Sequence, residues 1–142
     1  MLIEIVTQAD EELYTAFQCL VPQLTENNPP PSLGDLTALV QDTSSTLMVA
    51  RNDSGQIVGA LTLTIYRVPT GVRSIIEDVI VDRAARGQGI GELLMQRAIQ
   101  VARQKGAAHI ALTSNPMREA ANRLYLRVGF KKRETNAYQL KL

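Results

Sequence analysis

No tryptophan occurs among the 142 residues of this chain, and cysteine and histidine occur once each. A single cysteine, Cys19, cannot form an internal disulfide, which suits a reducing cytoplasm. Its neighbours Leu20 and Val21 favour a small buried hydrophobe over an acyl-carrying nucleophile. The histidine, His109, stands at the start of an expected strand and away from the motifs described below, so we expect an edge residue rather than a base.

An excess of charge of one sign is also missing, since 15 Lys and Arg face 14 Asp and Glu and the formal net charge is +1. This balance gives no electrostatic reason to expect nucleic acid or an anionic membrane as the main partner. No apolar run approaches the ~20 residues of a membrane span, and no secretory signal is visible at the N-terminus. Length and an apolar content of 45% instead predict one soluble globular domain over residues 1–142.

The most informative stretch runs from residue 75 to residue 94. A β-branched, apolar run up to Val81 predicts a buried strand, and the apolar residues from Ile90 onward recur at the spacing of one helix face. Three alternate glycines lie between them: Gly87, Gly89 and Gly91. Glycine permits turns that a Cβ would forbid and a close approach of a ligand to the main chain. A strand, a glycine turn and a helix N-terminus together predict a phosphate site.

Two common phosphate loops do not fit this stretch. A Walker A loop needs Gly-Lys-Ser/Thr after its last glycine, whereas Gly91 is followed by Glu92 and Leu93. A dinucleotide fingerprint needs Gly-x-Gly-x-x-Gly directly after the first strand of a βαβ unit, whereas these glycines alternate and lie in the middle of the chain. Both classes of site are therefore excluded.

The pattern that does fit is Arg86-x-x-Gly89-x-Gly91, which resembles the pyrophosphate loop of the GNAT superfamily of N-acetyltransferases. A second segment resembles the Asn…Ala-x-x-Leu-Tyr…Gly-Phe stretch of the same family: Asn115-Pro116, Ala120-Ala121-Asn122-Arg123-Leu124-Tyr125 and Val128-Gly129-Phe130. The resemblance covers residues 46–130 well and the first forty residues in outline.

Periodicity, turn residues and caps predict the remaining elements. We expect a strand over residues 2–6, helices beginning after Asp10 and after Ser32, antiparallel strands between residues 46 and 81, a helix ended by Lys105-Gly106, a strand over 109–113, a helix over 119–128 and a hairpin over 130–142. The order β-α-α-β-β-β-α-β-α-β-β is the GNAT order. It is an α/β (α+β) fold with a central mixed, largely antiparallel sheet flanked by helices. Gly59, inside a long strand, predicts a bulge or a close backbone approach.

The resemblance divides the chain into an acceptor-side strand and helical pair (1–45), a cofactor-binding core (46–130) and a terminal hairpin (131–142). It implies acetyl-CoA as cosubstrate and no metal. The residues implied to bind this cosubstrate are Val79, Ile80, Val81, Arg86, Gly87, Gln88, Gly89, Ile90, Gly91, Asn115, Asn122 and Tyr125. Two alternatives stay open: a ligand-free turn for the glycines and a solvent-facing role for Asn122.

Acetyl transfer to an amine needs a base, because a Lys-like amine is protonated at pH 7, and an acid for the departing thiolate. Glu77 and Asp78 are the acids of the central strand, and alternation along a strand should turn only one of them into the acceptor pocket. Glu77 shares a face with Val79 and Val81 in this reading and is the expected base. By the resemblance, Tyr125 is the expected acid, with an aromatic packed against the sheet as its alternative.

Three residues are expected near the mouth of this pocket: Tyr66, Arg67 and Arg73. With Asp78 they form the expected acceptor-binding set. The arginines would favour a small polar amine or a sugar phosphate, and a protein amine is equally compatible. The alternative for Glu77 is a structural carboxylate paired with Arg73 or Arg67. The run Ile-Glu-Asp-Val-Ile-Val also resembles the hexosamine-phosphate N-acetyltransferases.

These expectations predict an N-acetyltransferase that works by direct attack in a ternary complex. A non-catalytic CoA-sensing or protein-interaction module on the same fold is the main alternative. A nucleic-acid-directed acetyltransferase is disfavoured by the near-neutral charge. The family makes a homodimer possible, and neither the acceptor nor the oligomeric state can be predicted from the sequence.

Overall fold

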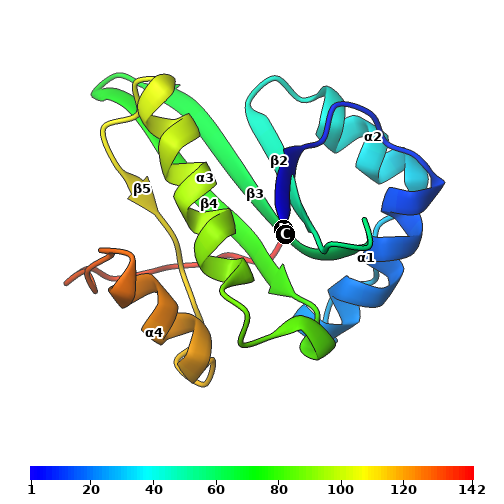
Figure 1. Ribbon diagram of the computed structural model, residues 1–142. Helices are drawn as coiled ribbons and strands as arrows, with labels where there is room; N and C mark the ends of the chain where they lie inside the picture. The colour runs from blue at the N-terminus through cyan, green and yellow to red at the C-terminus, as the bar shows by residue number, and fades with distance from the viewer.

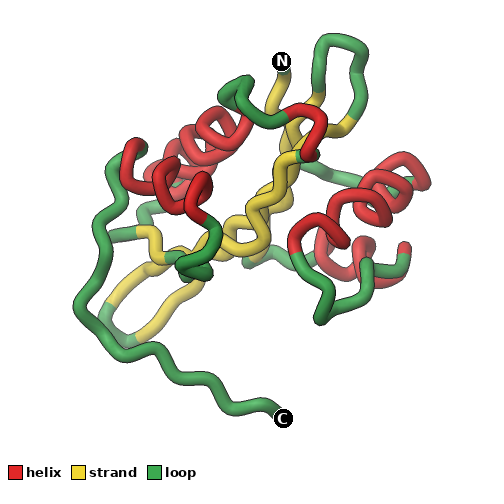
Figure 2. The backbone as a smooth tube through the Cα atoms, turned by 90° about the horizontal axis from the view of Figure 1, so that it is seen from below, coloured by secondary structure: helices red, strands yellow, loops and turns green.

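A computed structural model describes all residues from 1 to 142 and shows a sheet with helices on both faces (Figures 1 and 2). Its elements follow in the order β1 (Leu2–Ile5), α1 (Glu11–Leu24), α2 (Leu33–Gln41), β2 (Ser45–Arg51), β3 (Ile57–Val68), β4 (Gly71–Val81), the 3-10 turn η1 (Arg83–Ala85), α3 (Ile90–Gln104), β5 (Ile110–Ala111) and α4 (Glu119–Arg127). None of these helices combines the length and the apolar character needed to cross a membrane.

The five strands lie in the order β1-β2-β3-β4-β5. The first four pair antiparallel with their neighbours, and β5 pairs parallel with β4. The predicted mixed, largely antiparallel sheet is therefore confirmed. Strand β5 pairs with β4 and so forms the edge of the sheet opposite β1. The crossover through α3 connects β4 to this edge strand.

The sheet lies between α3 and α4 on one face and α1 and α2 on the other (Figure 2). An apolar cluster fills the space on each side of it. Successive residues of β2 alternate between them: Met48 and Ala50 pack toward α3, whereas Leu47 and Val49 pack toward α1 and α2. This alternation follows from the period of two along a strand. Since both faces are covered, the middle of β2 is apolar throughout and fully buried.

The two N-terminal helices begin at the residues expected from their capping chemistry. Asp10 Oδ1 accepts from Leu13 N at 2.9 Å. Ser32 and Asp35 cap each other reciprocally, since each side chain accepts a backbone N–H of the other residue at 3.0 Å. These three bonds satisfy N–H groups at the helix starts that have no partner within the first helical turn.

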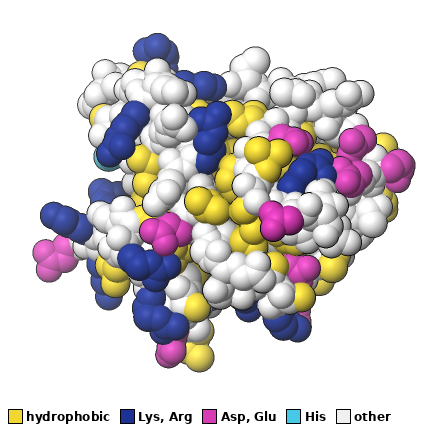
Figure 3. Space-filling model, in the orientation of Figure 1, with side chains coloured by type: hydrophobic (Ala, Val, Ile, Leu, Met, Phe, Trp, Pro, Cys, Tyr) yellow, Lys and Arg dark blue, Asp and Glu magenta, His cyan; other side chains and the backbone are white.

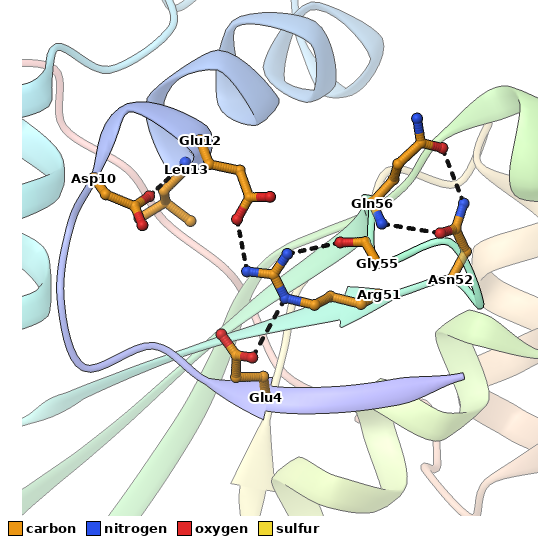
Figure 4. A network of polar contacts seen from close by, with 8 residues as sticks. All are labelled: Glu4, Asp10, Glu12, Leu13, Arg51, Asn52, Gly55 and Gln56. Atoms are coloured by element: carbon orange, nitrogen blue, oxygen red, sulfur yellow. Dashed lines mark hydrogen bonds and ion pairs between the residues drawn. The ribbon is translucent and has the colours of Figure 1, made fainter.

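Arg51, at the end of β2, joins β1, α1 and the turn between β2 and β3 (Figure 4). Its guanidinium donates to Glu4 of β1 at 3.3 Å, to Glu12 of α1 at 2.8 Å and to the carbonyl of Gly55 at 2.8 Å. The hydrogen bond from Arg51 holds the pKa of Glu12 below its ordinary value. The N-terminal end of α1 is thereby tied to the edge of the sheet, which orients the opposite end of that helix.

Gly59 marks a close approach between the sheet and α3, as its place inside a strand predicted. A Cβ at this position would lie 3.1 Å from both Ile80 O and Ile90 Cγ2. Both distances are shorter than ordinary van der Waals contacts, so a larger residue would push α3 away from the sheet. Gly59 therefore positions the first turn of α3, which follows the glycine loop.

Two sequence-based expectations about secondary structure and burial are wrong. The terminal hairpin is absent: residues 130–142 form neither helix nor strand, and Figure 2 shows the chain after α4 running as a loop to the C-terminus. Their alternate apolar residues Tyr138 and Leu140 are 90% and 82% exposed, so no buried face holds a strand there. Cys19 is exposed although Leu20 beside it is buried. Consecutive helix residues point about 100° apart, so neighbours in sequence can lie on opposite faces.

Candidate active site

Strand β4 loses one of its two neighbours halfway along its length. It pairs with β5 only through Ser74 with Ile110 and Ile75 with Ala111. Ser74 Oγ reinforces this contact by donating to His109 O at 2.8 Å. Beyond Ile75 the chain after β5 separates from β4, and residues 76–81 pair on the β3 side alone. Unpaired strand edges offer N–H and C=O groups to a ligand.

A β-bulge interrupts β4 at the two acids. Thr62 pairs with Glu77 and Ala60 pairs with Ile80, so Leu61 lies opposite two residues, Asp78 and Val79. Asp78 has a φ of +51°, a left-handed conformation that Asp adopts more readily than most side chains. An extra residue on one strand shifts the alternation of all residues beyond it.

The bulge corrects the predicted faces of β4. Val79 and Val81 pack in the α3 cluster together with Ile76, and Ile80 packs in the α1 cluster. Glu77 follows Ile76 without a bulge between them and therefore points to the opposite face. The expectation that Glu77 shares a face with Val79 and Val81 is wrong, because it assumed an uninterrupted strand.

A cavity of about 180 Å³, here called the splay pocket, opens where β4 and β5 separate. Its walls come from the end of α1 and the loop after it, from β4, from the chain after β5 and from the α4 region: Leu24, Thr25, Asn28, Ile76, Glu77, Asp78, Val79, Leu112, Thr113, Arg118 and Tyr125. Both Glu77 and Asp78 line this pocket. The expectation that only one acid could reach it is wrong for the same reason, the bulge at Asp78.

Neither acid is neutralised by a basic side chain of the protein. No Lys, Arg or His nitrogen lies within 4.0 Å of the carboxylates of Glu77 and Asp78. The alternative of an ion pair with Arg73 or Arg67 is thus contradicted, and Arg73 instead donates to Thr70 Oγ1 at 2.6 Å. Burial raises the pKa of Glu77, and the charge of Asp78 raises that pKa further.

The residues expected at the pocket mouth lie elsewhere. Tyr66 pairs with Arg73, and Arg67 pairs with Val72, close to the turn that joins β3 to β4. None of Tyr66, Arg67 and Arg73 lines the splay pocket. The antiparallel register carries them along the strands away from Glu77, so of the expected acceptor-binding set only Asp78 reaches the pocket.

Tyr125, from α4, is 6% exposed and lines the pocket beside the two acids. Its ring packs on Phe130 with the ring centroids 6.2 Å apart. Burial raises the pKa of Tyr125, and the neighbouring guanidinium of Arg118 opposes that rise. A side-chain hydrogen bond with Arg118 also opposes that rise. The Tyr125 side chain is therefore largely buried, and its phenol is protonated at neutral pH.

The glycine loop presents free backbone donors next to this pocket. Gly87 and Gly89 have φ values of +78° and +79°, which suit glycine, and no atom crowds the place of a Cβ at either residue. Within α3 the first N–H with a backbone acceptor is that of Leu93, which donates to Gly89 O at 3.1 Å. The N–H groups of residues 87–92, those of Gln88 and Ile90 included, have no acceptor in the protein. This is the arrangement that binds phosphate at a helix N-terminus.

Gly91, the third glycine of the loop, has a different structural role. A Cβ on Gly91 would lie 2.8 Å from Leu124 Cδ2. The contact joins the first turn of α3 to α4, the helix that carries Tyr125. Gly91 therefore serves helix packing, whereas Gly87 and Gly89 serve the turn.

Two arginine side chains cover carbonyls on the unpaired edge of β4. Arg86 Nε donates to Val81 O at 3.2 Å, and Arg118 Nη2 donates to Val79 O at 3.3 Å. Arg86 was among the expected site residues, whereas sequence reasoning missed Arg118. Its only signal in the sequence is its position just ahead of α4, between the two parts of the second motif.

Asn115 and Asn122 hold the loop that carries Arg118. Asn115 O accepts from Arg118 N and from Asn122 Nδ2, both at 3.0 Å. Asn115 Oδ1 accepts from Met117 N at 2.9 Å. The expected cofactor contact of Asn122 thus competes with a structural one, since its amide nitrogen already bonds within the protein.

Gln23, which sequence reasoning also missed, fastens the end of α1 to the start of the glycine loop. Its Oε1 accepts from Arg83 N at 2.8 Å, and its Nε2 lies 3.3 Å from Asp82 Oδ1 and 3.2 Å from Cys19 O. The residues that follow it, Leu24 and Thr25, line the splay pocket. One side chain therefore keeps the α1 wall of the pocket next to the glycine loop.

Charge is unevenly spread over the surface. On the face seen in Figure 3, Lys and Arg side chains spread over the α3 and α4 side, whereas Asp and Glu gather mainly on the α1 side. On this face the α3 and α4 side is thus the more basic one, although the whole chain is nearly neutral.

Comparisons with known proteins agree with this geometry. The model of the acetyltransferase (GNAT) family matches residues 11–130. A streptothricin acetyltransferase of Streptomyces lavendulae is 34% identical over 90 residues, which are 63% of this chain and 47% of the relative. A glucosamine 6-phosphate N-acetyltransferase of Trypanosoma brucei brucei is 33% identical over 92 residues, which are 63% of this chain and 60% of the relative.

Among solved structures, a transcriptional regulator of Bacillus halodurans C-125 superposes with a TM-score of 0.78 at 31% identity and covers 99% of both chains. The match to each of the two curated relatives spans less than two thirds of that relative. The family model, in contrast, takes in every element from α1 to α4, including the glycine loop and all walls of the splay pocket. This chain belongs to the GNAT family of acetyltransferases.

Proposed function

We propose that this protein is an N-acetyltransferase that transfers the acetyl group of acetyl-CoA to a primary amine by direct attack in a ternary complex. The observation that carries the proposal is the splay pocket, which unites Glu77, Asp78 and Tyr125 at the unpaired end of β4. The relatives named for streptothricin and for glucosamine 6-phosphate support an amine acceptor.

The residues around the pocket fit acetyl-CoA, which when bound supplies the acetyl group as a reactive thioester. The free N–H groups of residues 87–92 suit its phosphates, and the Lys and Arg side chains over α3 and α4 in Figure 3 suit its negative charge. The carbonyls of Val79 and Val81 already accept hydrogen bonds from arginine side chains. Amide N–H groups of a pantetheine arm would find acceptors at the same edge.

The roles of Glu77 as base and Tyr125 as acid follow from the surroundings of each side chain. Glu77 accepts a proton from the acceptor ammonium, and its raised pKa makes it a better proton acceptor near neutral pH than an ordinary glutamate. The freed amine nitrogen then bonds to the acetyl carbon as the carbon–sulfur bond breaks. Tyr125 donates its proton to the departing sulfur, and burial keeps the phenol protonated until that point. The nitrogen gives up its second proton to the Tyr125 oxygen as the amide forms, and Glu77 passes the first proton to solvent, so both residues return to their starting states.

A calorimetric titration with acetyl-CoA, followed by an assay of CoA thiol release with a panel of amines, tests the proposal. We expect saturable one-to-one binding and thiol release that requires an amine. Binding without release by any amine would favour the CoA-sensing alternative. Absence of binding at millimolar acetyl-CoA would show that the glycine loop is only a turn, and the enzyme would be excluded with it.

A further inference from the structure

We infer that Gln23 is a positioning residue that couples the glycine loop to the α1 wall of the splay pocket. Binding of the cosubstrate phosphates at the loop sets the position of the residues after α1, which form that wall. The inference rests on the proposed function and adds a residue that transmits one binding event to the other. Gln23 touches neither ligand and acts through the backbone of Arg83.

The side chain of Gln23 uses both of its polar atoms at the junction between β4 and the glycine loop. Its Oε1 accepts from Arg83 N at 2.8 Å, and its Nε2 lies 3.3 Å from Asp82 Oδ1. Gln23 and Arg83 are 60 residues apart, so only the folded structure brings them together. In Figure 1 the chain that follows β4 passes beside the last turn of α1.

This junction leads directly into the proposed phosphate site. Asp82 follows the last residue of β4, and its N–H donates to Val58 O at 2.8 Å. Its Oδ1 also accepts from Ala84 N at 3.3 Å and so caps η1. One 3-10 turn and one further residue separate Asp82 from Gly87. A constraint on the glycine loop is therefore carried to the contact with Gln23 over a short and internally bonded segment.

On the other side of the contact, the residues next to Gln23 form the pocket wall. Leu24 and Thr25 follow it directly, and Asn28 comes three residues later; all three line the splay pocket. Thr25 Oγ1 accepts from Asn27 N at 3.1 Å, so local bonds shape this turn. A shift of Gln23 therefore moves the wall with it.

Pro22 makes the wall depend on Gln23. Proline has no N–H, so the last turn of α1 lacks the helix bond that residue 22 would donate to Gln18 O. In the same turn Gln23 Nε2 supplies a side-chain bond to Cys19 O at 3.2 Å. With one bond of the backbone ladder missing, the end of α1 has less support from its own helix. It relies more on the contacts that Gln23 makes with the junction after β4.

These contacts let the acceptor wall respond to the cosubstrate. Phosphates bound by the free N–H groups of residues 87–92 fix the loop and, through η1, the N–H of Arg83. Gln23 then fixes the turn after α1, so an acceptor meets a wall that is already ordered. Linkage makes such an effect reciprocal, so an acceptor strengthens cosubstrate binding by the same factor.

Amide hydrogen exchange with CoA as the probe tests the coupling without an acceptor. The reporters are the N–H groups of Thr25 and Asn27, which donate to Val21 O and to Thr25 Oγ1. We expect saturating CoA to slow their exchange about two- to tenfold, the effect of one net hydrogen bond. The amides of β2, which lie in the buried middle of the sheet, report global unfolding and correct for changes in overall stability.

Gln23→Met removes both polar contacts and keeps the length of the side chain. In this variant CoA should still saturate the protein by calorimetry, whereas the slowing at Thr25 and Asn27 should be lost. Gln41→Met is the matched control, because Gln41 is an exposed residue at the C-terminal end of another helix, α2. It should keep the wild-type response.

A paired substitution tests the contact itself. Gln23→Glu keeps an acceptor for Arg83 N but sets a second carboxylate against Asp82, so the response to CoA should be lost. Adding Asp82→Asn supplies an amide that donates to the new carboxylate, while its oxygen can still cap η1. The double variant Gln23→Glu/Asp82→Asn should therefore recover the slowing. A thermal melt checks that each variant folds.

Slowing that persists in Gln23→Met, or that fails to return in the double variant, would overturn the inference. CoA binding without any slowing in the wild type would overturn it as well and leave the proposed enzyme intact. Slowing that depends on Gln23, without thiol release by any amine, would keep the coupling and remove the proposed function. Absence of CoA binding would remove both.

Discussion

Arg118 donates through Nη2 to Val79 O at 3.3 Å, although 39 residues separate the two. The bond spans the gap between β4 and α4 where β5 no longer pairs. The same guanidinium lowers the pKa of Tyr125 against the rise caused by burial. One arginine thus contacts both the strand edge proposed for the cosubstrate and the proposed acid.

Arg118→Met should tighten acetyl-CoA binding and lower kcat. A pantetheine amide would have to replace the guanidinium at Val79 O, so its removal should lower the Kd about two- to tenfold, as for one net hydrogen bond. The loss of positive charge beside Tyr125 and the departing thiolate should lower kcat. Calorimetry and thiol release measure the two effects. Arg123→Met, on an exposed residue of α4, is the control, and a raised Kd in Arg118→Met would mean that Arg118 holds the cosubstrate itself.

Tyr125→Phe should lower kcat about 100-fold while acetyl-CoA binding stays close to wild type, because only the proton donor is lost. The ring of Phe keeps the packing on Phe130. Single-turnover thiol release measures the chemical step directly. An unchanged kcat would leave Tyr125 as a packing residue, the alternative that its place in the core also allows.

The dependence of kcat/KM on pH should reflect the ionisation of Glu77 and the effect of Asp78 on it. Glu77 acts as a base only when deprotonated, so kcat/KM should rise with pH through a pKa above the ordinary glutamate value. Asp78→Asn removes the like charge, so the rise in kcat/KM should move to lower pH. The pKa of Glu77 should still exceed the ordinary glutamate value, because burial remains. Glu77→Gln should abolish this rise in kcat/KM with pH. A profile that is identical in wild type and Glu77→Gln would take Glu77 out of the mechanism.

Gly91→Ala should destabilise the fold through Leu124. The added Cβ lies 2.8 Å from Leu124 Cδ2, and overpacking of this kind costs about 1–3 kcal/mol. The gain from replacing glycine in a helix, roughly 0.5–1 kcal/mol, offsets part of that. Urea unfolding of Gly91→Ala, Leu124→Ala and the double variant should give a coupling of about 1 kcal/mol, since Leu124→Ala removes the clash. Strictly additive values would contradict the contact.

Gly34→Ala is the control for that experiment. Gly34 lies in α2, and a Cβ there would meet only Ser32 Oγ at an ordinary 3.7 Å. It should therefore raise the free energy of unfolding by roughly 0.5–1 kcal/mol, as expected where alanine fits a helix without strain.

Local signals predicted much of this protein. Asp10 and Ser32 cap their helices as their side-chain chemistry requires, and Gly87 and Gly89 adopt the left-handed conformations that a tight turn demands. These features depend on groups a few residues apart, so a single sequence contains everything needed to infer them. The motifs around the glycine loop and α4 likewise indicated the family that the comparisons confirm.

The site itself required contacts between distant segments. Alternation alone placed Glu77 and Asp78 on opposite faces, and the bulge opposite Leu61 brings both to one pocket. The pairing of β3 with β4 sets that register, and no pattern within β4 reveals it. Arg118 and Gln23 were missed for a related reason, since Gln23 and Arg83, which it binds, are 60 residues apart.

The difference between local signals and contacts between distant segments also explains why the predicted C-terminal hairpin was wrong. Periodicity in the last residues indicated a hairpin, but alternate apolar side chains form a strand only where a neighbour pairs with it and a core covers one face. The sequence by itself determined the helices, their caps and the glycine turn, because short-range sterics and hydrogen bonds control them. Tertiary structure alone placed two free carboxylates and a buried tyrosine around one cavity, because strand register and helix packing arise from contacts between segments far apart in the chain.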